Sequence, residues 1–389
     1  MRLLRVQVPD FRVLKNIDIS FEKDFFPQIF PIGSQNGGGK STLLQLIFIL
    51  LHCSGDSEKI EYVVNLLDRC QLEDELDQKP LAIFEILTDN QEEVKLEFFI
   101  CSDAYVKNLL SNLDGQKEDL DTVNVDDLLL AMFKNFLGIN KLVYLCQANN
   151  QKNEKIFLLC KFSQAIQEEF QLFMKELSSK IFLAAPSTQV FIFLPKATNK
   201  SLFQINQPTL DSSNYYLAMA DVKKKLINLF TYDFLPVELL INYLIMARDQ
   251  DFAQAIETGE YGNNYQLRRQ NLNSILSDKE INLDKDISGI TFKFKGDTNG
   301  EELYPEDLSH GELKRLSIYL WLKYRRIKDA IVLMDEIEIA LHPDWQYKII
   351  EDLQEWEPSN QYILATHSYE LCQALTPAHV KEIEPKLFK

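Results

Sequence analysis

The sequence has few cysteines, and their spacing offers neither a zinc site nor a disulfide framework. Its six cysteines are spread over 389 residues, and no two of them form a Cys-x-x-Cys pair. Zinc sites and redox dithiols depend on such pairs, and disulfide scaffolds depend on a denser set in a short chain. We therefore expect reduced thiols and a cytoplasmic protein.

Basic residues are scarce relative to acidic ones. The chain has 41 Lys and Arg against 58 Asp and Glu, which gives a formal net charge of −17. This balance disfavours a protein coated by nucleic acid, because such binding neutralises phosphates with Lys and Arg. Small basic clusters at residues 223–225, 268–269 and 325–328 fit solvated helix faces better, although they leave room for a local basic groove.

Long apolar runs and heptad repeats are missing too. Apolar runs such as residues 43–51 and 331–334 are far shorter than the ~20 residues of a transmembrane helix. Residues 1–8 alternate like a strand and lack the apolar block of a secretory signal. No heptad pattern or internal repeat is sustained, which argues against a long coiled coil. We expect a globular protein without a membrane segment.

Glycine is sparse as well, but three of the 13 glycines are consecutive and lie between an apolar strand and an apolar helix. The stretch reads Ser34-Gln35-Asn36-Gly37-Gly38-Gly39-Lys40-Ser41-Thr42. A strand, a glycine loop, Lys-Ser/Thr and a helix form the phosphate-binding P-loop, with Ser34 here in place of the first glycine of the pattern. We predict that this stretch binds ATP, that Lys40 reaches its terminal phosphates, and that Ser41 binds Mg²⁺.

A second apolar strand, at residues 330–334, ends in Asp335 and Glu336. An acidic pair after a strand can arise by chance, but a P-loop upstream makes a Walker B motif the better interpretation. We predict that Asp335 binds Mg²⁺ through water or Ser41, and that Glu336 activates the water that attacks ATP.

Two shorter patterns lie on either side of the acidic pair. Leu308-Ser309-His310-Gly311-Glu312 opens a predicted helix with the spacing of a capping box, so an ordinary helix start would explain it. Downstream, a strand at residues 361–365 leads to His367, and a lone histidine after a strand is usually structural.

In order and spacing, these motifs resemble the ABC-type ATPases of the SMC, RecF and OLD-like group, often described as AAA-family ATPases. Residues 11–21 resemble the opening F-x-x-L-K-x-I-x-I-x-F of that group, and residues 335–343 resemble its D-E-x-E-x-x-L-H-P. The resemblance covers residues 1–100 and 285–375 and includes the ATPase subunits of the Septu, PARIS and retron-associated anti-phage systems.

The resemblance implies that Ser309, His310, Gly311 and Glu312 form a signature loop. This loop would grip the γ-phosphate of an ATP molecule held on the P-loop of another subunit. The usual loop reads Leu-Ser-Gly-Gly-Gln, so His310 replaces a glycine and Glu312 replaces the glutamine.

The resemblance also implies a switch histidine and a Q-loop glutamine that act on the same phosphate. His367 falls at the position of the switch histidine. Gln189 is the first choice for the Q-loop residue and Gln147 is the second.

The implied fold is α/β, a P-loop NTPase of ABC type with a mixed sheet, an antiparallel β lobe, a largely helical insertion and no long coiled coil. We expect residues 1–100 to form the ATPase lobe with the P-loop, and residues 286–389 to form the lobe with the signature, Walker B and the switch histidine. Residues 101–285 would be an insertion that contains a β-hairpin, helices and the Q-loop. Within it we expect helices near residues 163–179, 215–230, 236–255 and 265–276, and strands at 181–185 and 190–194. We also expect two β-hairpins, one of residues 81–88 with 94–100 and the other of residues 141–147 with 155–161.

The implied function is a Mg²⁺-dependent ATPase that forms a homodimer or higher homo-oligomer around ATP. It would act as the regulatory or sensor subunit of a separate effector, a nuclease, in anti-phage defence. One alternative is a RecF-like repair ATPase that contacts nucleic acid across the dimer, which the acidic charge disfavours. A third is the nucleotide-binding subunit of a transporter, which Leu341-His342-Pro343 and the large insertion disfavour.

Overall fold

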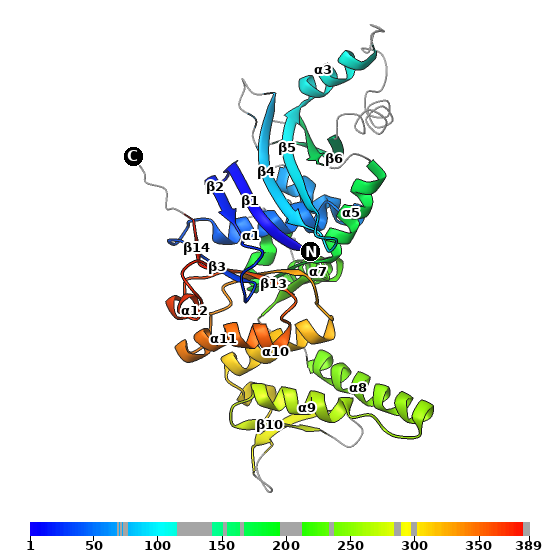
Figure 1. Cartoon of the computed structure of the whole chain (residues 1–389), viewed down its shortest axis with the longest axis vertical. Helices are drawn as coiled ribbons and strands as arrows, with labels where there is room; N and C mark the ends of the chain where they lie inside the picture. The colour runs from blue at the N-terminus through cyan, green and yellow to red at the C-terminus, as the bar shows by residue number, and fades with distance from the viewer. Residues whose placement is uncertain are drawn as a thin grey trace.

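The computed structural model shows two six-stranded β-sheets stacked one above the other, with helices between and below them (Figure 1). The residues that it describes are 1–67, 70, 72, 77–114, 142–150, 154–163, 167–194, 212–232, 237–283, 289–296 and 302–383. Among these residues, no helix combines the length and the apolar character needed to cross a membrane.

The upper sheet is antiparallel and has the strand order β2-β1-β4-β5-β7-β6 in the described residues. Its strands are β1 (Arg2–Phe11), β2 (Leu14–Ser20), β4 (Gln78–Leu87), β5 (Glu93–Ser102), β6 (Leu142–Asn149) and β7 (Lys155–Phe162). The predicted hairpins at 81–100 and 141–161 are confirmed as β4–β5 and β6–β7. Apolar and polar residues alternate along β2, as they do in a strand with one buried face.

The central sheet is parallel and has the order β14-β3-β13-β12-β8-β9 in the described residues. Its strands are β3 (Ile29–Gly33), β8 (Ile181–Ala185), β9 (Leu229–Thr231), β12 (Ile331–Asp335), β13 (Gln361–Ala365) and β14 (Lys381–Glu382). The fold therefore contains both parallel and antiparallel strand pairs, as expected. The parallel pairs lie in the central sheet and the antiparallel pairs of β1, β2 and β4–β7 lie in the upper sheet.

The core lies on both faces of the central sheet. Along β12, Ile331 and Leu333 pack into a cluster shared with α1 (Lys40–Phe48) and the antiparallel sheet. Val332 and Met334 point the other way and pack with the helices below the sheet. Burial on both faces explains why the central strands are continuous apolar runs rather than alternating ones.

Most of the helices form layers around this sheet, whereas α3 (Asp103–Asp114) packs against the antiparallel sheet at the top of the view (Figure 1). Alongside α1, the upper helices are α2 (Ile60–Leu67), α5 (Gln167–Ser179) and α7 (Ser212–Lys225), and a π-helical turn, Ile49–Cys53, continues α1. Below the sheet lie α10 (His310–Tyr324), α11 (Pro343–Trp356) and α12 (Tyr369–Gln373).

A further layer lies beyond α10 (Figure 1). It consists of α8 (Val237–Thr258), α9 (Asn264–Ile275) and the antiparallel hairpin of β10 (Lys279–Leu283) and β11 (Ile290–Phe294). We call these four elements the peripheral subdomain. Its buried side chains join the same cluster as those of α10 and α11, so it packs on α10 as part of one core.

Several helices predicted for residues 101–285 are confirmed, namely α5, α8 and α9. The predicted strand at 190–194 is wrong, because most of it lies in the 3₁₀-helix Ser187–Phe193. A short apolar run does not by itself distinguish a strand from another buried segment.

The predicted helix at 215–230 is also partly wrong, since α7 ends at Lys225 and the chain then forms β9. The buried residue Asn228 joins this segment to β8. Its side-chain amide donates to the carbonyl of Ile181 at 2.9 Å, and its own carbonyl accepts from the amide of Leu183 at 3.0 Å. These contacts favour a strand at the edge of the central sheet over a longer helix.

Segments between residues 101 and 285 pair with both sheets. Strands β6 and β7 extend the antiparallel sheet, and β8 and β9 form one edge of the central sheet. The domain boundaries at residues 100 and 286 stay a prediction, whereas the described strands of the peripheral subdomain pair only with each other and join neither six-stranded sheet.

Candidate active site

Three predicted motifs meet at the carboxyl edge of the central sheet. Strand β3 leads into the P-loop, β12 ends at Asp335, and β13 leads to His367. The strands are neighbours and in parallel register, with Ile32 opposite Ala365 and Ala365 opposite Asp335. Ligands of open parallel sheets bind at this edge, because all the loops that follow the strands emerge there.

The glycines of the P-loop are required by close packing. Gly39 has a φ of 97°, and a Cβ atom there would lie 2.6 Å from Cδ2 of Leu14. A Cβ atom on Gly38 would lie 2.4 Å from Oγ of Ser34. Glycine thus lets the loop pack closely against Ser34 and Leu14 at the start of α1, where an anion is favoured.

Lys40 and His367, predicted from separate motifs, are in contact. The amine of Lys40 lies 2.8 Å from Nε2 of His367, 3.0 Å from Oγ of Ser34 and 3.2 Å from its carbonyl oxygen. Burial lowers the pKa of Lys40, and the nearby carboxylates of Asp335, Glu338 and Glu336 oppose that effect. The contact brings the amine and the imidazole together beside the loop.

Asp335 and Ser41 lie at the same edge of the sheet. Asp335 is 3% exposed. Burial raises the pKa of Asp335 to about 6, the nearby Ser41 hydroxyl opposes the rise, and the Glu336 and Glu338 carboxylates add to it. Its Oδ1 atom is buried and has no hydrogen-bond partner in the described residues. A buried carboxylate oxygen without a donor, next to a hydroxyl, fits a hard cation such as Mg²⁺.

Glu336 follows Asp335 in a left-handed backbone conformation, with a φ of 52°. Its amide donates to the carbonyl of Ala365 at 3.0 Å, and its carbonyl accepts from the amine of Lys314 at 3.0 Å. Lys314 also donates to the carbonyl of Ile339 at 3.0 Å and comes from α10. The turn that carries Glu336 is thus held by β13 on one side and by α10 on the other.

Glu338 has a positioning role that sequence reasoning missed. Its Oε1 atom accepts from the backbone amide of His367 at 2.7 Å, and only 9% of the residue is exposed. It therefore ties the turn after β12 to the loop that carries the histidine. The sequence did contain a signal for this role, because Glu338 is the second glutamate of the D-E-x-E pattern.

The structure separates the two Q-loop choices. Gln189 lies just after β8, beside β12, and its side chain contacts Gln45 on α1. Gln147 lies on β6 in the antiparallel sheet. Only Gln189 follows a strand of the central sheet, and its role at the phosphate stays a prediction.

The predicted signature residues open α10, which lies on the face of the sheet opposite α1 (Figure 1). The capping box is confirmed, because the amide of Glu312 donates to Oγ of Ser309 at 3.2 Å and Glu312 accepts from the amide of Ser309 at 2.9 Å. His310 is exposed. A Cβ atom on Gly311 would lie 2.9 Å from the Trp345 ring and 3.0 Å from the carbonyl oxygen of Ala340.

The chain is similar in sequence to known ATPases. A family model described as an AAA ATPase domain matches residues 1–372. The chain is 32% identical over 96 residues to the Retron Vc95 probable ATPase of Vibrio cholerae serotype O1 biovar El Tor. This alignment covers 22% of the chain and 19% of that protein. It is 40% identical over 51 residues to the Retron Ec83 probable ATPase of Escherichia coli, and this alignment covers 13% of the chain and 9% of that protein. The chain thus aligns with less than a fifth of the length of either relative.

Solved structures of SMC head domains also align with the chain. The SMC head domain from Thermotoga maritima is 10% identical, with 96% of this chain and 92% of that chain covered and a TM-score of 0.44. A Smc head domain with an extended coiled coil from Pyrococcus furiosus is 12% identical, with 96% and 91% covered and a TM-score of 0.44.

We expect the substitution Asp335→Asn to stabilise the metal-free and nucleotide-free protein at neutral pH. The carboxyl pKa rises from its ordinary 3.8 to about 6 on folding, so the folded state keeps the proton longer than the unfolded state. Stability therefore falls as pH rises through this window and stays lower above it. A shift of about two pKa units corresponds to on the order of 3 kcal/mol.

Urea titrations in EDTA at pH 4 and pH 7.5 measure this effect. The gain in free energy of unfolding should be present at pH 7.5 and nearly absent at pH 4. The exposed residue Asp24 provides the matched control, since Asp24→Asn should change little at either pH. An Asp335→Asn variant that is less stable than the parent at pH 7.5 would contradict the account of this carboxylate.

Proposed function

The chain belongs to the AAA ATPase domain family, and from this premise we propose that it is a Mg²⁺-dependent ATPase that dimerises around ATP. The observation that carries the proposal is the division of the phosphate-binding parts. Lys40, Ser41, Asp335 and His367 meet at one edge of the central sheet, whereas Ser309 opens a helix on the opposite face from α1. A second copy of the chain would bring its Ser309 to the first copy's ATP.

The residues present account for the steps of hydrolysis. Lys40 and His367 would hold the γ-phosphate and neutralise the charge that develops on it. Glu336 would accept a proton from the attacking water as the bond between the γ-phosphorus and the bridging oxygen breaks, yielding ADP and phosphate. Ser41 and Asp335 would hold Mg²⁺, which supplies charge neutralisation between the phosphates when it is bound.

Ser309 of the second copy would complete the site. The N-terminus of α10 carries its serine hydroxyl and free backbone N–H groups, and both favour an anion. ATP would then link two chains, and its hydrolysis would release them. Hydrolysis would therefore change the oligomeric state of the protein, and Glu336 would control when this change occurs.

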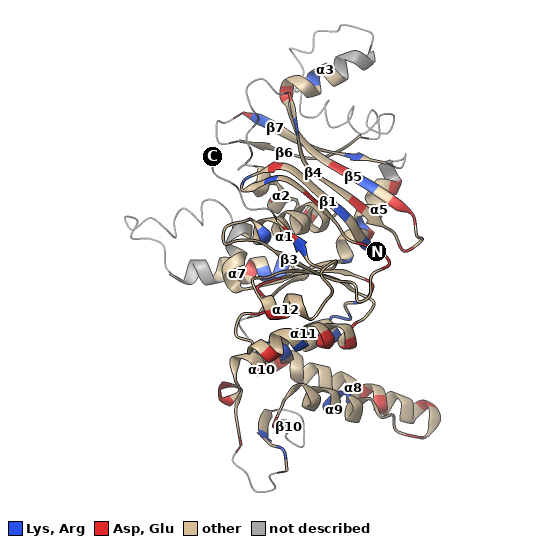
Figure 2. Cartoon of the chain, turned by 60° about the vertical axis from the view of Figure 1, so that its left-hand side comes forward, with Lys and Arg blue, Asp and Glu red and all other residues tan. Residues whose placement is uncertain are grey.

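We infer further that this switch controls a separate effector, a nuclease, in anti-phage defence in the cytoplasm. The sequence relatives named as retron ATPases support this role, together with the D-E-x-E-x-x-L-H-P motif. A RecF-like DNA-binding role gains no support from the described residues, since the Lys and Arg positions along the ribbon are interspersed with Asp and Glu (Figure 2). Phage plating on cells that carry the native locus tests the role, since Lys40→Ala should abolish protection and unchanged protection would contradict it.

We expect Glu336→Gln to accumulate an ATP-bound dimer. The amide cannot take a proton from water, so hydrolysis should fall by at least about a hundredfold, while the groups that bind ATP stay in place. Light scattering with saturating ATP and Mg²⁺ should give twice the mass seen without nucleotide.

Lys40→Ala is the control for this experiment, since it removes the amine that contacts His367 and should neither bind ATP tightly nor dimerise. A Glu336→Gln protein that binds ATP and stays monomeric would rule out the dimer.

A further inference from the structure

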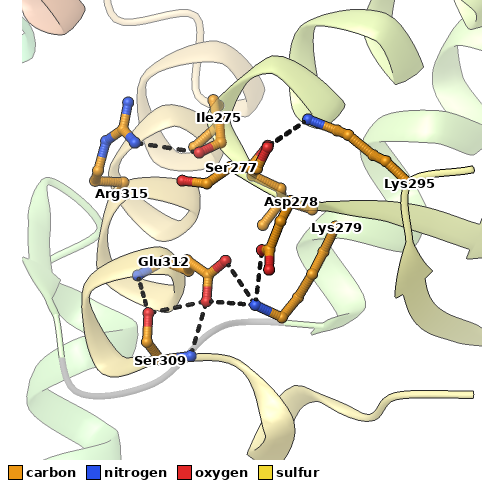
Figure 3. A network of polar contacts seen from close by, with 9 residues as sticks. Ile275, Ser277, Asp278, Lys279, Lys295, Ser309, Glu312 and Arg315 are labelled. Atoms are coloured by element: carbon orange, nitrogen blue, oxygen red, sulfur yellow. Dashed lines mark hydrogen bonds and ion pairs between the residues drawn. The ribbon is translucent and has the colours of Figure 1, made fainter.

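The peripheral subdomain reaches the signature loop through a network of polar contacts (Figure 3). Lys279, the first residue of β10, points its amine at the carboxylate of Glu312, at 3.1 Å from Oε1 and 3.3 Å from Oε2. The amine also donates to Oδ1 of Asp278 at 3.0 Å. The Glu312 side chain is 4% exposed and that of Lys279 is 13% exposed, so little solvent screens the pair.

The same carboxylate holds the serine that is expected to grip phosphate. Oε2 of Glu312 accepts from Oγ of Ser309 at 2.9 Å and from the amide of Ser309 at 2.9 Å. A hydroxyl has one proton, so Ser309 cannot donate it to Glu312 and to a phosphate oxygen at the same time. Binding of ATP by this loop therefore requires the hydroxyl to leave Glu312.

Lys279 lowers the barrier to that exchange in two ways. Its amine competes with the hydroxyl for the lone pairs of Oε2, and its positive charge offsets the carboxylate that would otherwise repel the phosphate. A glutamine at this position, as in the usual signature loop, is neutral and needs no such cation. The glutamate at position 312 makes the loop dependent on Lys279.

Lys279 is held firmly by the peripheral subdomain. It pairs in register with Phe294 of β11, and its amine lies 5.7 Å from the centre of that ring. Lys295, which follows β11, donates to the carbonyls of Leu276 and Ser277 at 2.7 and 3.0 Å and so fixes the hairpin to the end of α9 (Figure 3). A displacement of α9 or of the hairpin would carry Lys279 with it.

We propose that Lys279 is a positioning residue for the signature loop, and that the peripheral subdomain controls through it whether Ser309 can bind the ATP of a second copy. This proposal rests on the proposed function, because it assumes the ATP-linked dimer. It predicts that Lys279 acts on dimerisation and turnover and leaves ATP binding to a single chain unaffected, since the P-loop leads into α1, on the opposite face of the sheet from α10.

The test compares Lys279→Met with Lys293→Met. Lys293 forms an ion pair with Glu280 at 3.1 Å on the same hairpin, and neither residue takes part in the network with Ser309. We expect Lys279→Met to bind a fluorescent ATP analogue within about twofold of the parent, and to lose at least about tenfold in ATP-driven dimerisation and in kcat. Lys293→Met should stay within about twofold in all three, and Lys279→Arg should retain most of the parent's activity.

The double variant Lys279→Met with Glu312→Gln distinguishes positioning from simple structural support. The amide removes the unpaired carboxylate and still accepts from Ser309, so the double variant should recover most of the activity that Lys279→Met loses. Glu312→Gln alone is measured beside it, as the neutral background in which the effect of Lys279→Met is judged. The double variant also provides a test if Lys279→Met alone fails to fold.

Two results would overturn the proposal. One is a Lys279→Met protein that dimerises and hydrolyses ATP like the parent, and the other is a double variant no more active than Lys279→Met. Failure of the dimer itself is recognised separately, because Glu336→Gln with an intact Lys279 would then stay monomeric in ATP.

Discussion

The parallel pairing of β3, β13 and β12 is the constraint on which the site depends. It brings the P-loop, the histidine loop and the acidic turn to one edge of the sheet, although Lys40 and His367 are 327 positions apart. Apolar side chains on both faces hold this register, because a shift of one residue would exchange the two buried faces. The polar contacts of Lys40, Asp335 and Glu338 follow from that register and would not persist without it.

Helix α10 connects this edge with the rest of the molecule. Lys314 holds the backbone of Glu336, Gly311 packs against Trp345, and Glu312 reaches Lys279. One helix thus contacts the turn that would hydrolyse the chain's own ATP and carries the serine that would bind the ATP of a second copy. A movement of α10 would affect both half-sites together, which is what a switch controlled by assembly requires.

Much of this arrangement could be predicted from the sequence, because short apolar strands followed by glycine, Asp-Glu or histidine are local signals. The two hairpins of the antiparallel sheet followed from alternation in the same way. The role of Glu338, the contact of Lys314 with the Glu336 carbonyl, and the pair of Lys279 with Glu312 could not be predicted, since each joins residues that only the fold brings together. Strand β9 was missed for a similar reason, as it depends on the contacts of Asn228 with β8.

The central claim is that each chain supplies half of every ATP site, and mixing two inactive variants tests it most directly. Lys40→Ala removes the P-loop half, and Ser309→Arg removes the signature half. A symmetric dimer of either variant should have no intact site, whereas a mixed dimer should have one. The account predicts that an equal mixture recovers about a quarter of the parent's ATPase activity, because half of the dimers are mixed and each has one of two sites. A mixture as inactive as its components, or a Ser309→Arg protein with full activity by itself, would contradict it.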